Sequence, residues 1–342
     1  MYKANKELAK LMQQIDVVIE VLDARMPAAS SNPLLHRARR RHHKPCLHIL
    51  NKADLADPVS TREWIQALNQ QPGSLALANG KDALLSTQLV VGACERLVAE
   101  SLQPDESPQP DESLQQDEPN DDPTPRPTRQ RRYNAVIAGI PNVGKSTLLN
   151  QLLGRKIAKT GNEPAVTKQQ QRVRLSERWF LFDTPGVLWP RLDDQDAALR
   201  LAAAGAIRNT ALVFEDVGMG AAEFLLRDFP AALTQRYGID PLPATAEAFM
   251  TELAGRRGCR GRNNSIDWHR VSEILLYDYR EGRLGRLTLE AASMLTDDTA
   301  DTVPADTPQS ESSADTSIST TNTTPADAVD TAGNHGKPTA SS

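Results

Sequence analysis

What the sequence lacks excludes several classes of protein. It has three cysteines, and they are scattered without CxxC or CxxH spacing, so neither a disulfide framework nor a zinc site is indicated (Cys46, Cys94 and Cys259). No apolar run approaches the ~18 residues that a membrane-spanning helix needs, and the opening MYKANKELAK has no apolar core typical of a secretory signal. We therefore expect a cytoplasmic protein with no membrane partner, and we expect it to be a monomer.

The charge of the chain is distributed unevenly. The formal net charge is −5, but residues 101–128 and residues 291–342 each contain eight acids and one base. The rest of the chain therefore carries +9, which suits a nucleic-acid partner, although an ordinary solvated basic surface is the alternative. Both acidic segments have few large apolar residues, so we expect them to be disordered.

Short apolar runs alternate with helical patterns along the remaining chain. We expect strands at residues 17–22, 46–50, 75–78, 133–138, 171–175, 179–182 and 211–214. From about residue 218 the pattern is helical alone, with helices expected at about 220–235, 245–257 and 267–279. Buried strands that alternate with helices are typical of a parallel sheet covered on both faces. The predicted fold class is therefore α/β, followed by a small helical C-terminal part.

The clearest motif is GIPNVGKS at residues 139–146, which follows an expected strand and opens an expected helix. It matches GxxxxGK[ST], the phosphate-binding loop of P-loop proteins, whose glycines let backbone N–H groups wrap the phosphates. We expect Lys145 to reach the β- and γ-phosphates and Ser146 to ligate Mg²⁺. The other nucleotide contacts expected from this segment are Asn142, Val143, Gly144 and Thr147.

A second motif, Asp183-Thr-Pro-Gly186, ends another expected strand. An acid at this place can hold the Mg²⁺ shell, and the backbone N–H of Gly186 can sense the γ-phosphate. A simple β-turn is the alternative. Thr167 lies between the P-loop helix and this motif, where a switch threonine would ligate Mg²⁺, and a surface loop threonine is its alternative.

A third motif, Asn51-Lys52-Ala53-Asp54, directly follows the apolar run CLHIL. A carboxylate there can accept hydrogen bonds from N1–H and N2–H₂ of guanine, a donor pair that adenine lacks, so the motif predicts GTP rather than ATP. Taken alone, it could also be a helix cap. The turn formed by Asn79, Gly80 and Lys81 could add a backbone contact to the base edge, but its sequence is too degenerate to decide whether it does.

The order of these motifs is permuted. In Ras-like GTPases the base-reading motif lies downstream of the P-loop, whereas here Asn51 precedes Gly139. A chain can start at a different strand and still build one site if its former ends are joined, and the acidic segment 101–128 lies where such a join is needed. The sequence therefore predicts a circularly permuted GTPase, in which Asp54 and Lys145 converge on one nucleotide.

The chain resembles the YlqF/RbgA-type circularly permuted GTPases, which act in assembly of the large ribosomal subunit. The motifs that carry this resemblance are LDARMP (22–27), NPL (32–34), LNKAD (50–54), GIPNVGKSTLLN (139–150), IAKTGNEPAVT (157–167), DTPGVLWP (183–190), GRRGC (255–259) and GRLGRLTLE (282–290). The resemblance implies a Ras-like domain followed by a helical domain that contacts ribosomal RNA. Basic residues that fit this role, with a solvated surface as their alternative, are Arg256, Arg257, Arg260, Arg262, Arg270, Arg283 and Arg286.

The catalytic group differs from that of Ras-like enzymes. Ras-like enzymes orient the attacking water with a glutamine after DxxG, and Val187 at this position cannot do so. The resemblance implies that Asn142 helps to hold a K⁺, which would stabilise transition-state charge; Lys145, Thr167 and Gly186 complete the expected catalytic set. Some members use a histidine in a Gly-His-Met leader, so this chain either lacks that leader or starts upstream of Met1. Ala165 replaces the glycine usual before the switch threonine.

These patterns predict five segments: the base-reading part of the GTPase domain, a disordered linker, the phosphate-binding part, a helical RNA-binding domain and a disordered tail (1–100, 101–130, 131–215, 216–290 and 291–342). We expect the protein to bind GTP or GDP with Mg²⁺, and K⁺ as the resemblance implies. One hypothesis is a GTP-hydrolysing assembly factor that binds the large (50S) ribosomal subunit and its rRNA with GTP and leaves after hydrolysis. The other is a nucleotide-gated RNA-binding module with negligible turnover.

Overall fold

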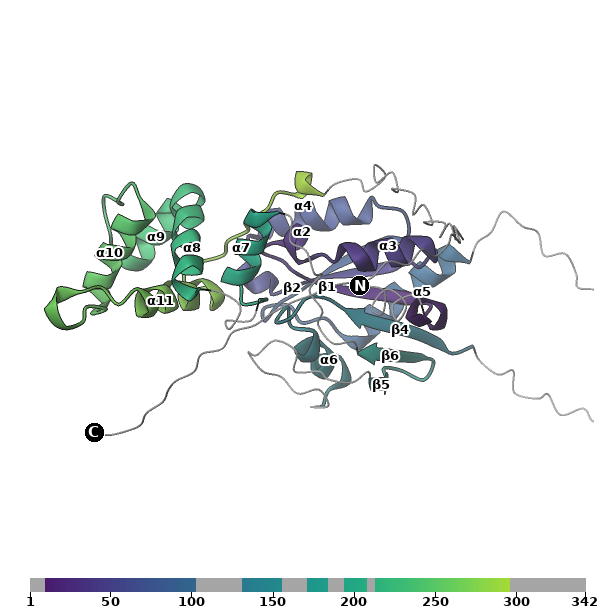
Figure 1. Ribbon diagram of the computed structural model, residues 1–342. Helices are drawn as coiled ribbons and strands as arrows, with labels where there is room; N and C mark the ends of the chain where they lie inside the picture. The colour runs from purple at the N-terminus through teal and green to yellow at the C-terminus, as the bar shows by residue number, and fades with distance from the viewer. Residues whose placement is uncertain (1–9, 103–130, 156–170, 184–193, 208–212, 296–342) are drawn as a thin grey trace, which may run out of the picture. The chain divides into compact units, whose positions relative to one another are not determined.

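A central six-stranded sheet organises the computed structural model, which describes residues 10–102, 131–155, 171–183, 194–207 and 213–295 (Figure 1). The strands are β1 (Val17–Asp23), β2 (Cys46–Asn51), β3 (Ser74–Asn79), β4 (Tyr133–Ala138), β5 (Gln171–Arg174) and β6 (Trp179–Asp183). Their order in the sheet is β3-β2-β1-β4-β6-β5, and only β5 runs antiparallel to its neighbour. The chain thus starts twice at the centre of the sheet: β1 leads outward through β2 to β3, whereas β4 is followed by the edge strand β5 and then by β6 between them.

Helices cover both faces of this sheet. On one face, α5 (Thr87–Ser101) and α6 (Lys145–Leu153) bury Val90, Leu97 and Leu148 against inward-facing side chains such as Ile19 and Ile137. The other face packs against α3 (Pro33–Arg41), α4 (Pro58–Asn69) and a helical turn at residues 10–14. Because both faces are covered, β1 and β2 are buried at every position, which is why they read as continuous apolar runs.

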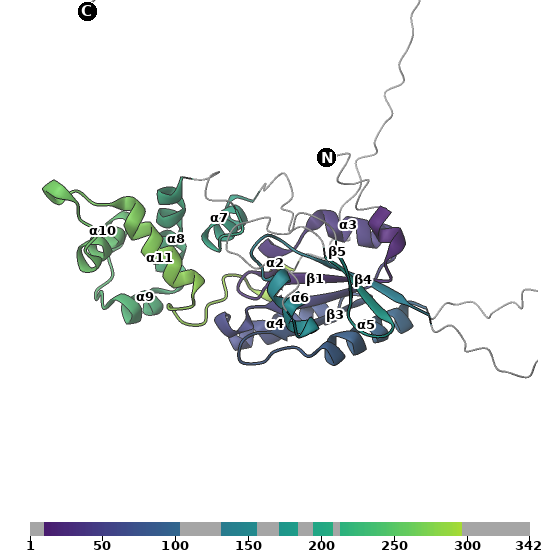
Figure 2. The same ribbon diagram turned by 90° about the horizontal axis from the view of Figure 1, so that it is seen from below.

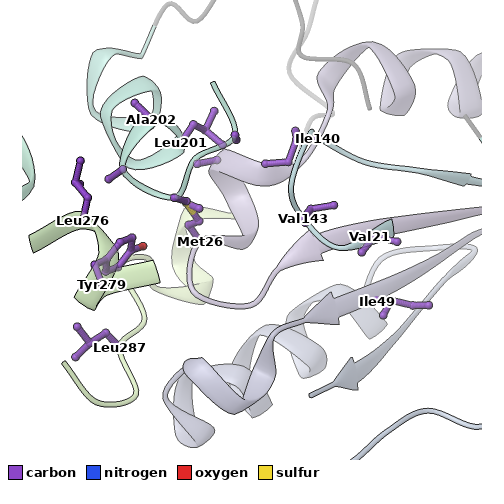
Figure 3. Close-up of a cluster of buried hydrophobic side chains, with 14 of the residues drawn as sticks. Val21, Met26, Ile49, Ile140, Val143, Leu201, Ala202, Leu276, Tyr279 and Leu287 are labelled. Carbon is purple, nitrogen blue, oxygen red and sulfur yellow. The ribbon is translucent and has the colours of Figure 1, made fainter. Parts of the chain in front are cut away.

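The segment after β6 is helical in the described residues. Its helices are α7 (Gln195–Ala203), α8 (Phe214–Asp228), α9 (Pro230–Tyr237), α10 (Ala246–Arg257) and α11 (Trp268–Arg280), followed by a short 3₁₀ turn, η4 (Ala292–Met294). A continuous cluster of buried side chains runs from Val21 and Ile49 in the sheet through Met26 and Leu201 to Tyr279 (Figure 3). None of the helices within the described ranges combines the length and apolarity needed to cross a bilayer.

Six of the seven expected strands are confirmed, with ends within a residue of those predicted. The expected strand at 211–214 is wrong where the structure describes it, because Val213 is the N-cap of α8 and Phe214 opens that helix; residues 211–212 lie outside the described ranges. The apolar run continues at helical spacing through Val217, Ala221 and Leu225, and a short apolar run alone cannot distinguish a strand from a buried helix. The helices expected at 245–257 and 267–279 are confirmed, whereas the stretch expected at 220–235 forms two helices, because Pro230 ends α8 and opens α9. The division into domains stays a prediction.

A buried polar cluster fixes the α3 side of the sheet. Glu20, in the middle of β1, accepts hydrogen bonds from the backbone N–H of Asn32 at 3.0 Å and from His36 Nε2 at 2.9 Å, and it pairs with His48 Nδ1 at 3.2 Å. Burial alone would raise the pKa of Glu20, but the two imidazoles hold it well below its usual value. Burial would lower the pKa of His48, but Cys46 and Glu20 raise it to about 10.

We predict that Glu20→Gln lowers the free energy of unfolding by about 3 kcal/mol, because it leaves a buried imidazole cation without its anion. Because folding lowers the pKa of Glu20, its contribution to stability is fully present above its pKa in the unfolded chain and is lost on acidification. Because folding raises the pKa of His48, its contribution to stability is present below its pKa in the unfolded chain and is lost as pH rises toward about 10. Urea unfolding from pH 4 to 10 should therefore show the largest difference from wild type in the mildly acidic range. A difference that does not change with pH would contradict the ion pair.

Candidate functional site at the carboxyl edge of the sheet

Four loops meet where the parallel strands end. β4 leads into residues 139–146, β1 into residues 24–27, β2 into Lys52 and Asp54, and β3 into Gly80 (Figure 2). The strand order reverses between β1 and β4, and in open α/β sheets the crevice at such a reversal is where ligands bind. Residues from both sides of the acidic segment therefore arrive at one edge of the sheet.

The loop at residues 139–146 has the backbone of a phosphate cradle. Gly139, Asn142 and Gly144 all have positive φ, at +154°, +57° and +103°. A Cβ at Gly139 would lie 2.5 Å from the backbone oxygen of Val21, so the loop is closely packed on β1. No side chain caps the N-terminus of α6, and the Nζ of Lys145 donates to the backbone oxygens of Gly139 and Ile140 at 3.0 and 2.8 Å. This loop can wrap an anion with its backbone N–H groups.

The base-reading motif contacts this loop directly. Asn51 Nδ2 donates to the backbone oxygen of Val143 at 2.7 Å, and Asn51 Oδ1 accepts from Asn79 Nδ2 at 2.7 Å. A Cβ at Gly144 would lie 2.2 Å from Asn51 Nδ2, so this approach requires glycine there. Gln151 of α6 completes the network by donating to Asn79 Oδ1 at 3.0 Å. The side-chain amide of Asn51 thus joins the end of β2 to the phosphate loop and to the end of β3.

Asp54 packs closely against the loop that follows β3. A Cβ at Gly80 would lie 2.7 Å from the backbone nitrogen of Asp54 and 3.0 Å from its Oδ1, so glycine permits this contact. Lys81 Nζ lies 3.9 Å from Asp54 Oδ2, and its side chain is exposed. Asp54 is half-buried in the 3₁₀ turn η1 (Ala53–Leu55), which begins after Lys52 in the left-handed region at φ +60°. Asn79, Gly80 and Lys81 therefore lie beside Asp54.

A buried charge cluster lies between these loops. Asp23, the last residue of β1, pairs with Arg25 at 2.9 Å and with Lys52 Nζ at 2.9 Å. Burial alone would raise the pKa of Asp23, but the two cations hold it well below its usual value. Burial lowers the pKa of Lys52, against the opposing effect of Asp23. This cluster gives Lys52 a partner inside the protein and fixes the loop that carries Asp54.

The C-terminal segment 282–290 runs along the same loops. Leu287 N donates to the backbone oxygen of Leu55 at 3.0 Å, and Leu289 N donates to that of Arg25 at 2.7 Å. The carboxylate of Glu290 accepts from the backbone N–H groups of Ala28 and Ala29, at the start of α2 (Pro27–Ser30). Burial raises the pKa of Glu290, although these N–H groups and Arg200 favour its charge. The residues that follow α11 are therefore hydrogen-bonded next to Asp54.

Other predicted site residues are described only in part. Thr167, Gly186 and Val187 lie outside the described residues, as does Ala165. Asp183 ends β6 and pairs in register with Ile137 on β4, two residues before Gly139, but its side chain is not described. Asn142 Nδ2 donates to the backbone oxygen of Gly205 at 2.6 Å. Ser146 is half-buried and Thr147 exposed in the first turn of α6.

Sequence reasoning missed Asp23, Arg25, Gln151 and Glu290 as parts of this edge. Arg25 also donates to the backbone oxygen of Tyr279 at 3.2 Å and lies 4.7 Å from the centre of its ring. The available signal was the Asp-Ala-Arg triplet directly after a buried strand, at the same place relative to β1 as Asn51 has relative to β2. No local pattern pointed to Gln151 or Glu290, because their partners lie far away in the sequence.

We predict that Gly144→Ala reduces GTP affinity by at least about tenfold, because its Cβ would displace Asn51 from the phosphate loop. Gly154→Ala is the matched control: it has φ +62° but nothing within 4 Å of the added Cβ. Both variants should lose about 1 kcal/mol of stability from left-handed strain. Fluorescence titration with a labelled GTP and thermal unfolding measure the two effects. Equal nucleotide affinities in the two variants would refute the role of the Asn51 contact.

Comparison with known proteins agrees with this architecture. Residues 134–223 match the family model described as 50S ribosome-binding GTPase. Ribosome biogenesis GTPase A of Bacillus cereus is 37% identical over 290 residues, covering 85% of this chain and 91% of that protein. The protein of the same name from Priestia megaterium is 34% identical over 293 residues, covering 86% of this chain and 95% of its own.

Solved structures of YlqF have the same fold. GNP-bound YlqF from T. maritima has a TM-score of 0.56 at 21% identity and covers 85% of this chain and 98% of its own. A GDP-bound YlqF structure has a TM-score of 0.55 at the same identity, with 83% and 98% coverage. The sheet order supports the expected permutation, since the strand leading to the base-reading motif precedes the P-loop strand in sequence. The chain is a circularly permuted GTPase and belongs to the ribosome biogenesis GTPase A family.

Proposed function

We propose that this chain hydrolyses GTP during assembly of the large (50S) ribosomal subunit, binds its rRNA when GTP is bound, and leaves after hydrolysis. The observation that carries the proposal is the hydrogen bond from Asn51 to Val143, which joins the base-reading motif to the phosphate loop. Loops so joined can contact the base and the phosphates of one nucleotide. The names of the relatives support the ribosomal partner. The protein would act as a ribosome-associated monomer in the cytoplasm.

The proposed nucleotide contacts follow from this edge. Asp54 would accept hydrogen bonds from guanine, with Gly80 and Lys81 beside the base edge and with Lys52 supporting the loop. The backbone from Asn142 to Thr147 would surround the phosphates. Lys145 would exchange its two backbone oxygen acceptors for phosphate oxygens. Asn51 and Asn79 would act as positioning residues, since their amides are bonded to each other and to Val143.

The chemistry of the chain fits a bound Mg²⁺ and a monovalent cation. The uncapped start of α6 puts the Ser146 hydroxyl beside the phosphate loop, and Asp183 ends the strand next to it. These oxygen ligands, with Thr167, are of the type that Mg²⁺ prefers, and the ion would neutralise phosphate charge. Asn142 would help to hold K⁺ once its amide leaves Gly205, and Gly186 would contact the γ-phosphate.

The C-terminal segment supports a connection between the nucleotide and the helical region. Its backbone bonds to Leu55 and Arg25 lie one residue from Asp54 and two from Asp23. A shift of these loops on GTP binding would therefore be passed to α11 through residues 282–290. Such coupling requires the two nucleotide states to bind the segment differently.

Three arginines of the helical region are the strongest candidates for rRNA phosphates. Arg257, Arg260 and Arg270 are exposed, and no ion pair with a described carboxylate involves them. Arg256, Arg283 and Arg286 instead pair with acids, at Glu252, Asp278 and Asp82. The side chain of Arg262 is not described, so its part in the proposal rests on sequence alone.

We predict that the protein sediments with purified large ribosomal subunits in the presence of a non-hydrolysable GTP analogue and much less with GDP. Phosphate release should rise when subunits are added, and it should be faster in K⁺ than in Na⁺. Arg257→Gln/Arg270→Gln should weaken sedimentation without changing GTP affinity. Equal sedimentation in both nucleotide states would overturn the release step, and turnover that subunits and cations never stimulate would favour the RNA-binding module.

We predict that Asp54→Asn weakens GTP binding by about 10- to 100-fold, because a charge-assisted pair of hydrogen bonds to guanine is lost. Xanthine offers a carbonyl acceptor where guanine has its amino donor, so the variant should bind xanthosine triphosphate better than the wild type does. Lys145→Ala is the comparison, since it should weaken both nucleotides alike. Unchanged guanine preference in Asp54→Asn would show that this side chain does not contact the base.

A further inference from the structure

A second basic surface lies at the other end of the sheet. Arg131 and Arg132 precede β4, Arg172 lies on β5, and Arg178 precedes β6 (Figure 1). Because β4 and β6 are parallel, residues 131–132 and Arg178 lie at the amino edge of the sheet. Arg172 lies on the antiparallel edge strand, level with Phe182, and its side chain reaches back to Phe180 and Asn134. We call Arg132 and Arg172, with Phe180 and Phe182, the arginine–aromatic surface.

Aromatic rings hold these guanidinium groups in place. The Cζ of Arg172 lies 4.1 Å from the ring centre of Phe180 and 5.7 Å from that of Phe182. Arg132 Cζ lies 5.9 Å from the same Phe180 ring. Two arginines thus reach one half-buried phenylalanine of β6 from its two sides, Arg132 from the start of β4 and Arg172 from β5.

A similar arrangement surrounds Tyr133 on the opposite face of the sheet, because Tyr133 and Trp179 alternate with Asn134 and Phe180 along their strands. Arg131 and Arg178 lie 5.2 and 5.3 Å from its ring centre, and the ring stacks on the buried Trp179 at 5.0 Å. Trp179 thereby fixes the tyrosine ring. A guanidinium beside a ring keeps its N–H donors directed away from the ring plane, available to a planar or tetrahedral anion.

Carboxylates neutralise little of this charge. Within the described ranges, Arg131 alone of the four forms an ion pair, at 3.3 Å to Asp16, and its side chain is 56% exposed. Arg172 is exposed and donates to Asn134 Oδ1 at 3.4 Å. Other described acids nearby are Glu177, in the turn before β6, and Glu95, which accepts from Trp179 Nε1 at 3.4 Å on the Tyr133 face. Neither forms an ion pair with Arg132 or Arg172 among the described residues.

We propose that the arginine–aromatic surface binds the sugar–phosphate backbone of RNA, as a contact separate from the nucleotide edge and from the helical region. The inference rests on the proposed function for its RNA partner. Two guanidinium groups held against one aromatic pair match neighbouring phosphates along a strand.

The test uses the full chain with Arg132→Gln/Arg172→Gln. A fluorescein-labelled 20-nucleotide oligouridylate is the probe, and binding is measured by anisotropy from 50 to 200 mM KCl. We expect about a tenfold loss of affinity, and a salt dependence shallower by about 1.4 in the logarithmic slope, because two phosphate contacts are removed. The matched control is Arg62→Gln/Arg96→Gln, which removes the same charge from exposed positions on α4 and α5.

Two results would overturn the inference. One is oligouridylate affinity within twofold of the control variant. The other is displacement of the RNA by polyglutamate of equal charge as effectively as by unlabelled RNA, which would assign the surface to acidic peptides. Arg132→Lys/Arg172→Lys should restore most of the salt slope but not the affinity, since lysine keeps the charge and loses the planar contact.

The same variants separate this inference from the proposed function. If wild type and the glutamine variant sediment equally with ribosomal subunits in the GTP-analogue state and bind oligouridylate equally, the surface has no RNA role and the proposed function stands. If wild type does not sediment in either nucleotide state, the proposed function itself fails. Labelled-GTP affinity should be the same in all variants if the RNA contact is separate from the nucleotide edge. Arg172 lies level with Phe182, one residue before Asp183, so a loss of GTP affinity in the glutamine variant would count against a separate contact.

Discussion

The amide of Asn51 is the contact on which the functional edge depends. One side chain donates to the P-loop backbone at Val143 and accepts from Asn79, so three loops from both halves of the permuted chain share a single hydrogen-bond network. The network is nearly excluded from water, where a hydrogen bond left unmade costs more than one formed at the surface. It also explains Gly144, since any Cβ there would collide with the Asn51 amide. Permutation changes the order of the loops in sequence while leaving this contact between neighbours in space.

The paired charges around this network fix the positions of the neighbouring loops. Asp23 would be costly to bury alone, and its pairing with Arg25 and Lys52 turns the end of β1 into a fixed junction. Arg25 continues to Tyr279 in α11, and Glu290 binds the first turn of α2. The helical region is thus attached to the loops that flank Asp54, rather than to the outer strands. Under the proposed function, this attachment would let a change in the loops beside Asp54 reach α11, provided that the two nucleotide states hold the attachment differently.

Sequence alone predicted the sheet well and the site in part. Strands such as Val17–Asp23 are buried on both faces, so they appear in the sequence as short, largely apolar runs between turn residues. The P-loop and NKxD motifs are local spacings, which made Lys145 and Asp54 accessible to prediction. Phe214 was misjudged because four apolar residues fit a strand and a helix turn equally. The roles of Gln151 and Glu290 could not be predicted, because each bonds to a residue far away in the sequence, 72 positions for Gln151 and more than 260 for Glu290.

The place of the join between the two halves follows from the same topology. α5 ends at the amino edge of the sheet and β4 begins there, so the join starts after Leu102 and ends before Arg131, away from the nucleotide loops. Closing a longer join costs little, since each doubling of length adds only about 0.6 kcal/mol. The acidic insertion can therefore be long without affecting Asn51 or Gly144.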